Sequence, residues 1–316
     1  MTGPVWHGEI RLVSSDPLAM DDVRTFTAQV GAPPRVLVVA PSTREAVHWR
    51  TALAPTGVKF QTEFLTVSRI AAAEYDGFDV VYLINVPQLP DAEWARLARF
   101  VEQGGGLGVF LGSNAIKPAA YERAQVQSFL PARLMAVRER TGRRMSIDQP
   151  EHPVFRKLSD DGATVLLEND VEIHRYFTLE VAEGTSTLVT ISDETGSPLL
   201  VERTYGQGRV AVFASAVDPA QGGLSRWNNF SDPTQVGWPF LAFAESLTLH
   251  LARTTENIFN YSAGDAVVLR FPVTEAARTF LVRRPAFRQT RATLPAGESS
   301  LIISDAQDAG VYTLVD

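Results

Sequence analysis

The stretch FDVVYLINVPQLPDAEWARLARFVEQGGGLGVFLG, residues 78–112, decides the fold class. Residues 79–86 are largely apolar, which is typical of a strand that is covered on both faces of a sheet. Residues 90–101 carry apolar side chains at helical spacing. The three glycines at 104–106 then end the predicted helix and turn the chain into a second apolar strand, residues 107–112. A strand, a helix and a strand with short connections indicate a parallel sheet with flanking helices.

The pattern extends in both directions from this stretch. On its N-terminal side, the sequence predicts strands at 36–40 and 59–65, with a helix that starts at Ser42 between them. On its C-terminal side, we expect a helix at 118–130, mostly strands between 133 and 216, and a helix at 239–252. We therefore predict one α/β domain over residues 35–255.

The two ends of the chain have a different sequence pattern. Residues 8–13 and 24–30 read as two strands, and the tail contains several short strands separated by Pro, Gly and Asp. Two strands cannot bury a core by themselves. We therefore expect residues 1–31 and 260–316 to form one small β-sandwich of the Ig-like kind, with the α/β domain inserted between its halves.

Composition and charge exclude several classes of function. The 316 residues include no cysteine, which excludes disulfides, thiolate metal sites and a cysteine nucleophile. Lys and Arg number 29 against 36 Asp and Glu, and this acidic balance argues against nucleic acid as a partner. One basic run, residues 138–144, is interpreted as a solvated hairpin tip. The apolar run at 236–252 is interrupted by Glu245 and His250, so we expect a soluble chain that meets a membrane only through segments outside it.

Several motifs occur in an order that resembles a known family. They are the strand at 78–83, the helix end FVEQGGG at 100–106, GVFLG at 108–112, EHPVF at 151–155 and GQGRV at 206–210. Together they resemble the class I glutamine amidotransferase-like fold, an α/β fold with a flavodoxin-like doubly wound sheet. The chain looks most similar to such domains in bacterial membrane-anchored proteins that also carry von Willebrand A modules, the BatA-like group. This resemblance implies an extracytoplasmic location in the periplasm or cell envelope, and a cytoplasmic location stays open.

The same resemblance implies that the family's chemistry is absent. Catalytic members carry a cysteine at a sharp strand-to-helix turn, in a sequence like GICLG. The matching segment here places Phe110 at the nucleophile position, with Gly112 and Ser113 after it. The family's histidine, and the acid two residues after it, match Ala214 and Ala216. We therefore expect no catalytic residue, no metal and no cofactor.

Other residues leave alternatives open. Ser113 could replace the missing nucleophile if a base lay within reach, and His152 and His174 are the histidines in plausible loops. This would make the chain a hydrolase or a carbohydrate-related enzyme of the same fold. The plainer interpretation is that Ser113 and Asn114 cap the next helix and that the His152 ring bonds to backbone. A stretch in which every second residue is acidic or histidine could bind a cation or form a solvated strand edge. It comprises Glu168, Asp170, Glu172 and His174. The remaining histidines, His7, His48 and His250, are interpreted as scattered, without the spacing of metal ligands.

Ligands of doubly wound folds bind at the carboxyl ends of the strands. The residues that we expect around this crevice are Asn85, Ser113, Asn114, Asp218 and Trp227. An exposed Trp227 beside polar side chains would favour glycan binding. The first hypothesis remains a non-catalytic interaction or scaffolding module that binds another protein or a cell-envelope component.

Overall fold

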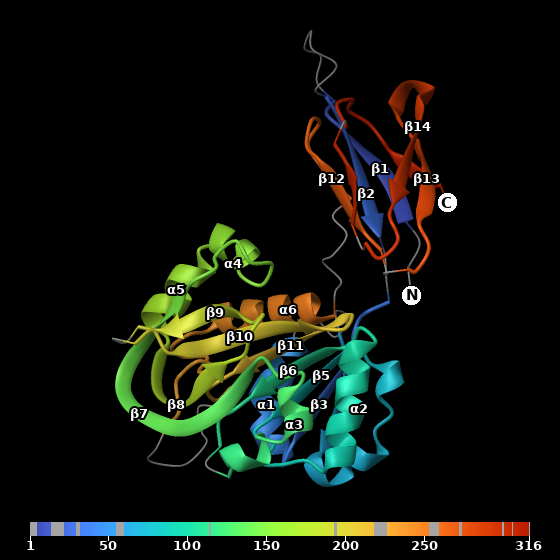
Figure 1. Ribbon diagram of the computed structural model, residues 1–316. Coiled ribbons are helices and arrows are strands. Elements are labelled where there is room, and N and C mark those ends of the chain that lie inside the picture. The colour runs from blue at the N-terminus through green and yellow to red at the C-terminus, as the bar shows by residue number, and fades with distance from the viewer. Residues whose placement is uncertain are drawn as a thin grey trace. The chain divides into compact units, whose positions relative to one another are not determined.

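The computed structural model describes residues 5–13, 22–29, 32–54, 60–113, 115–192, 195–217, 226–252, 259–271, 274–298, 300–304 and 306–315. The chain divides into two compact units (Figure 1). The α/β unit comprises residues 33–254. The β unit comprises residues 1–32 together with 255–316.

A nine-stranded sheet forms the centre of the α/β unit, in the order β4-β3-β5-β6-β11-β10-β9-β7-β8. Its strands are β3 (Arg35–Ala40), β4 (Gln61–Thr66), β5 (Val80–Ile84), β6 (Gly106–Phe110), β7 (Ala132–Ile147), β8 (Glu172–Val181), β9 (Ser186–Ile191), β10 (Pro198–Tyr205) and β11 (Gly208–Phe213). The strands from β4 to β11 in this order are parallel, and each of the remaining four is antiparallel to its neighbour.

The parallel half has the strand order 2-1-3-4-5 along the chain, which is the order of flavodoxin-like sheets. Every residue of β5 and β6 is buried, because both faces of these central strands are covered. The predicted α/β fold is therefore confirmed, and the apolar runs at 79–86 and 107–112 correspond to the two central strands.

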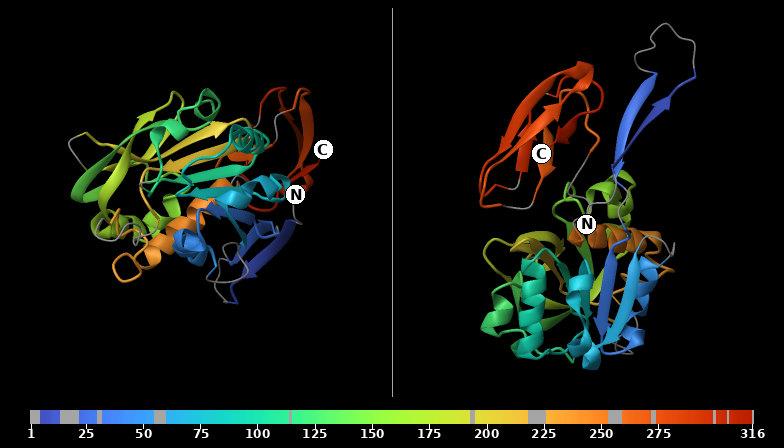
Figure 2. Two further views of the ribbon diagram at one scale, coloured as in Figure 1. Left: turned by 90° about the horizontal axis from the view of Figure 1, so that it is seen from below. Right: turned by 90° about the vertical axis from the view of Figure 1, so that its right-hand side faces the viewer.

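Helices cover both faces of the sheet (Figure 2). They are α1 (Thr43–Leu53), α2 (Asp91–Glu102), α3 (Ala124–Gln127), α4 (Arg156–Asp160), α5 (Ala163–Asp170) and α6 (Trp238–Leu251), with short 3₁₀ turns at Val67–Ala72, Tyr75–Gly77 and Pro118–Ala120. Helix α6 contacts α1, α4 and α5, whereas α2 contacts α3. Among the described residues, no helix is both long and apolar enough to cross a membrane.

Glycines in β6 allow α6 to approach the sheet closely. A Cβ at Gly106 would lie 2.5 Å from the carbonyl oxygen of Leu251, at the end of α6. A Cβ at Gly108 would lie 2.3 Å from the ring of Tyr82, whose hydroxyl bonds to Thr248 Oγ1 of α6 at 2.8 Å. Close packing of the chain against β6 therefore explains Gly106 and Gly108.

Two predicted segments have a different structure. The helix expected at 118–130 is a 3₁₀ turn followed by the four-residue helix α3. The region from 133 to 216, expected to be mostly strand, also contains α4 and α5. Glu168 and Asp170 therefore lie on a helix, while Glu172 and His174 lie on β8, so the four do not share one strand face.

The basic run at 138–144 is not a hairpin tip. It lies within the single 16-residue strand β7. Gly142 has a φ of 66°, and the pairing of β7 with β8 shifts register between Glu139 and Arg143. The glycine that resembles a turn signal in the sequence thus marks an irregularity inside a long strand.

The β unit contains three separate sheets among the described residues. The first pairs β1 (Val5–Arg11) with β2 (Val23–Gln29), the second pairs β12 (Val267–Arg270) with β15 (Ser300–Ile303), and the third has the order β14 (Gln289–Leu294), β13 (Arg278–Arg283), β16 (Thr313–Val315). Phe280, Leu294 and Leu301 form its small core. Asn260 links the chain's two ends, because its Oδ1 accepts the Thr27 amide at 2.8 Å and its Nδ2 donates to the Thr27 carbonyl at 2.9 Å.

We expect the F110A substitution to lower the free energy of unfolding of the α/β unit by about 3–5 kcal/mol, because it leaves a cavity in a core buried on all sides. Chemical denaturation followed by tryptophan fluorescence measures the change. V47A, at an exposed position of α1, is the control and should change the value by less than about 0.5 kcal/mol. A loss below about 1 kcal/mol in F110A would contradict this account of the core.

Candidate functional site

Asn85 connects the carboxyl ends of the two central strands. It follows β5 directly, is fully buried and has a left-handed backbone with a φ of 54°. Its amide donates to the carbonyl of Phe110 at 3.0 Å, and its Oδ1 accepts the amide of Gly112 at 2.8 Å. Its Nδ2 is buried and has no hydrogen-bond partner in the described part of the chain. Asn85 therefore serves mainly to fix the ends of β5 and β6.

Phe110, which the resemblance assigns to the family's nucleophile position, is the last residue of β6. It pairs with Ile84 on one side and Phe213 on the other. Its ring is 1% exposed and packs against Trp49 at 4.5 Å, Tyr82 at 5.7 Å and Phe213 at 5.8 Å between ring centroids. A benzyl group cannot attack a carbonyl carbon, and here it fills the core beneath the strand ends.

Ala214 and Ala216, which the resemblance assigns to the family's histidine and acid positions, are both fully buried. Ala216 packs so closely on Gly112 that a Cβ at Gly112 would lie 2.2 Å from the Ala216 Cβ. The Ala214 carbonyl accepts the amide of Phe177 at 2.8 Å, which binds β8 to this edge. The matching positions are therefore packed against neighbouring backbone and offer no titratable group.

Ser113 is partly buried and lies in a turn. Its Oγ accepts the amide of Ala115 at 3.2 Å, and its carbonyl accepts the amide of Ile116 at 3.1 Å. The next helical element begins only at Pro118, so Ser113 does not cap a helix. Asn114 and Asp218 lie outside the described residues.

Trp227 is buried and packs on its own unit. Its side chain is 1% exposed and stacks on Phe177 with 5.7 Å between centroids, while its carbonyl accepts the amides of His174 and Arg175 at 2.8 and 2.9 Å. It is thus not the exposed aromatic that glycan binding requires. The neighbouring Asn228 donates to Ser215 Oγ at 2.8 Å and to the Ala216 carbonyl at 2.7 Å.

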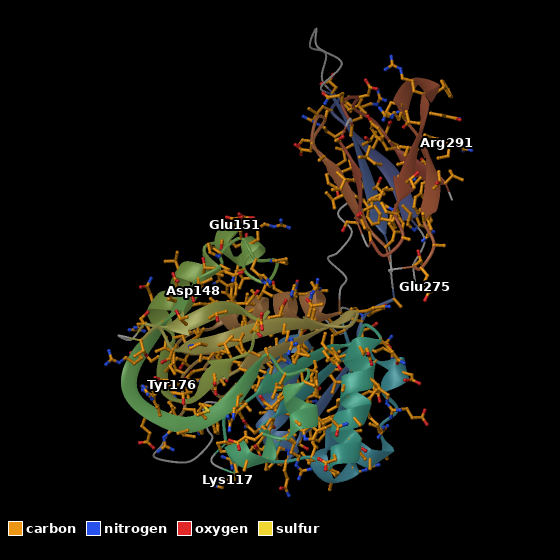
Figure 3. All side chains as sticks on the ribbon, in the orientation of Figure 1. Lys117, Asp148, Glu151, Tyr176, Glu275 and Arg291 are labelled. Carbon is orange, nitrogen blue, oxygen red and sulfur yellow. The ribbon has the colours of Figure 1, made fainter. Side chains whose placement is uncertain are left out.

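A second site lies away from the predicted crevice, where three segments bring together His152, Glu202 and His250. Glu202 comes from β10 and His250 from the end of α6. His152 comes from the segment before α4, next to Glu151, which is labelled in Figure 3. His250 Nε2 lies 2.7 Å from Glu202 Oε2, and His152 Nε2 lies 3.8 Å from Glu202 Oε1. Each histidine therefore faces a different oxygen of one carboxylate.

Burial controls the charges in this cluster. The pKa of His152 is lowered from 6.5 to about 4: burial is the largest cause, the charge of Glu202 opposes it, and the nearby charges of His250 and Arg209 act in the same direction as burial. Burial alone would raise the pKa of Glu202, but the hydrogen bond from His250, with the charges of His250, His152 and Arg209, brings it below its usual value. Near neutral pH the cluster thus contains an ionised carboxylate beside a neutral His152 imidazole.

Two imidazoles and one carboxylate form a donor set that divalent metals bind. One ligand atom from each of the three residues lies within 4.8 Å of the other two. The interpretation of His250 as a scattered histidine is therefore wrong. The sequence contains only weak signals for this site, namely a charged Glu202 after the buried run Leu199–Val201 and a histidine on the buried side of α6.

Among the described residues, the predicted acidic stretch does not form a group of three ligand residues, although Glu172 Oε2 lies 3.9 Å from His174 Nε2. Glu168 Oε1 accepts the amide of Ile147 at 2.8 Å, and Glu172 pairs with Arg144 at 3.4 Å. His174 Nδ1 accepts the amide of Gly142 at 3.1 Å. These contacts hold β7 against α5 and β8.

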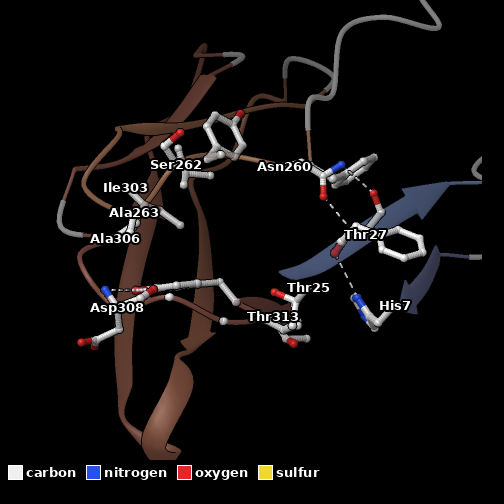
Figure 4. Close-up of a pocket in the computed structure, with 18 of the residues that line it drawn as sticks. His7, Thr25, Thr27, Asn260, Ser262, Ala263, Ile303, Ala306, Asp308 and Thr313 are labelled. Atoms are coloured by element: carbon white, nitrogen blue, oxygen red, sulfur yellow. Dashed lines mark hydrogen bonds between the residues drawn. The ribbon is translucent and has the colours of Figure 1, made fainter. Parts of the chain in front are cut away.

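The β unit contains a cavity of about 710 Å³ between its two chain segments (Figure 4). His7, Thr25 and Thr27 line it from the β1–β2 pair, and the tail contributes further polar and apolar residues: Tyr261, Val267, Leu269, Ile303 and Tyr312. None of the predicted site residues lines this cavity.

We expect the stability of the α/β unit to fall as the pH drops from 6.5 towards 4. Unfolded His152 binds a proton in this range, whereas folded His152 stays neutral until about pH 4, so protons favour the unfolded state. In H152Q this contribution, about 2–3 kcal/mol, should disappear. Denaturation at pH 4–8 with a chelator present measures it, with S159A as the control that keeps the wild-type slope. Equal slopes in H152Q and wild type would contradict the prediction.

Known structures are similar to this chain at low sequence identity. Two cytoplasmic proteins from Salmonella typhimurium are similar to this chain, each with 19% identity. STM3548 has a TM-score of 0.50 over 78% of this chain and 96% of its own, and STM1381 from strain LT2 has a TM-score of 0.51 over 79% and 97%. A ThuA-like protein from Bacteroides uniformis has 14% identity and a TM-score of 0.46, over 70% of this chain and 94% of its own. No curated protein matches this sequence.

A family model agrees with the strand order and the motifs. The GATase1-like model, described as "Putative glutamine amidotransferase", matches residues 67–234. The match runs from the segment before β5 to residues after β11, and it includes the carboxyl ends of β5, β6 and β11 as well as Glu202. It covers more than half of the sequence, and the chain therefore belongs to the glutamine amidotransferase-like family.

Proposed function

We propose that this chain is a non-catalytic interaction or scaffolding module built on the amidotransferase-like fold. The observation that carries the proposal is Phe110, a buried core side chain at the position that resembles the family's nucleophile. Ala214 and Ala216 support it, because the positions of the general base and its acid hold methyl groups packed against backbone. Nucleophile and base are thus missing together.

The proposal assigns the interaction to the carboxyl-end edge of the sheet. At this edge Asn85 and Trp227 are buried, whereas Ser113 is partly exposed and can touch a partner. The partner is another protein or a cell-envelope component. In this proposal the β unit is an Ig-like sandwich, and both units belong to the extracytoplasmic part of a membrane-anchored bacterial protein. The Salmonella proteins named above are cytoplasmic, so the experiment below separates the two locations.

The alternative of a hydrolase that uses Ser113 and His152 has less support. The described contacts of Ser113 Oγ are with its own turn, and those of the His152 ring are with Glu202, His250 and the amide of Val154. A serine nucleophile needs its base within hydrogen-bond reach. No described contact joins the two residues.

We expect the purified chain to release no ammonia from glutamine above the rate of the buffer, since neither nucleophile nor base is present. A coupled glutamate dehydrogenase assay measures this rate, and a nitrophenyl ester assay tests for a serine hydrolase. The S113A variant should be indistinguishable from wild type in both assays. Turnover by wild type that S113A abolishes would overturn the proposal and establish the hydrolase.

We expect the chain to retain a partner from the envelope fraction of its source cells and not from the cytosolic fraction. S113W, which places a bulky ring at the carboxyl-end edge, should reduce the retained amount at least about tenfold, because packing at an interface core tolerates little added volume. T51W, at an exposed position of α1, is the matched control and should retain as much as wild type. Equal retention by S113W, or retention from cytosol alone, would contradict the proposal.

A further inference from the structure

We propose that His152, Glu202 and His250 bind a divalent transition-metal ion of the zinc class. This inference is independent of the proposed function, because none of the three residues belongs to the carboxyl-end edge. The residues converge from three elements that the sheet brings together, and 48 residues separate Glu202 from His250 in the sequence. Such convergence of two imidazoles on one carboxylate is the pattern of a ligand set.

The geometry is close to that of a coordination site. Zinc lies about 2.0–2.2 Å from nitrogen and oxygen ligands, so the ligand atoms of one ion are about 3–3.5 Å apart. Here the carboxylate oxygens lie 2.7 Å from His250 Nε2 and 3.8 Å from His152 Nε2, and all ligand atoms lie within 4.8 Å of one another. The His152 side chain is 15% exposed, whereas His250 is 4% exposed. A small rotation of His152, at the partly open side, would complete the set and leave a position for water.

The other ring nitrogen of His250 adds a second observation. His250 Nδ1 is buried and has no hydrogen-bond partner among the described residues, whereas His250 Nε2 contacts Glu202. Buried ring nitrogens in native proteins are nearly always partnered, because an unpartnered one has lost its bond to water. The contacts within the protein therefore leave the polar atoms of this cluster incompletely satisfied.

The nature of the ligands selects the class of metal. Mg²⁺ and Ca²⁺ prefer sites made of oxygen atoms, whereas imidazole suits Zn²⁺, Co²⁺ and Ni²⁺. The chain has no cysteine, so a site of this class has to be built from histidine and carboxylate. Two histidines with one carboxylate are a common set for zinc with an open position.

The positive charge of Arg209 should weaken metal binding at this cluster. Its Nε lies 4.0 Å from Glu202 Oε1, and its guanidinium donates to the carbonyl of His250 at 2.9 Å. The guanidinium and a metal ion compete for the same carboxylate charge. Removal of this positive charge should therefore strengthen metal binding, while loss of a purely structural ion pair would leave the affinity for metal unchanged.

The test uses the full chain after chelator treatment and dialysis. We expect Zn²⁺ at about 100 times its dissociation constant to raise the melting temperature by about 5–10 °C, and Mg²⁺ to have no effect. Co²⁺ should give visible absorption bands of a low-coordinate nitrogen and oxygen site. H250Q and E202Q should lose both signals, and R209Q should bind Zn²⁺ several-fold more tightly in calorimetry.

H152Q keeps the proposal falsifiable if the two more deeply buried variants do not fold, because His152 lies at the exposed side of the cluster. It should weaken Zn²⁺ binding at least about tenfold. H174Q, which removes a histidine of β8, is the matched control and should bind as wild type does. No shift with Zn²⁺ in wild type, or a shift that persists unchanged in H152Q, would overturn the proposal.

Discussion

The central strands β5 and β6 must be covered on both faces, and most features of the α/β unit follow from this constraint. Their side chains are buried without exception, so α1 and α6 have to pack on one face and α2 on the other. Phe110 is part of this arrangement, since its ring fills the space between Trp49, Tyr82 and Phe213. Phe110 is thus a residue on which the fold depends, and a smaller side chain at this position would cost packing.

Continuous apolar runs are sufficient to predict the central strands and the helix between them, because burial on both faces leaves a signal in every residue. The peripheral elements give weaker signals. Helices α3, α4 and α5 have four to eight residues, too few to establish a helical period, and α4 and α5 lie in a region otherwise rich in strands. Gly142 resembles a turn residue, and only the pairing of β7 with β8 and β9 decides that it lies inside a strand.

Single residues of the candidate site can likewise be predicted only where the signal is local in the sequence. The burial of Phe110, Ala214 and Ala216 follows from the apolar strands that contain them or precede them, whereas their match to the family's nucleophile, base and acid stays a prediction from motifs that are continuous in sequence. The cluster of His152, Glu202 and His250 could not be predicted, since its members meet only after β10 pairs with β11 and α6 packs against β11. The buried states of Asn85 and Trp227 also depend on tertiary contacts that no local pattern contains.

The insertion of residues 33–254 between the two segments of the β unit has a mechanical consequence. Tension that enters through β1 and leaves through β16 acts first on the contacts between these segments, such as the paired hydrogen bonds of Asn260 with Thr27. The α/β unit bears load only after those contacts break. The contacts between the two segments of the β unit therefore bypass the α/β unit, and the nine-stranded sheet carries no tension until those contacts break.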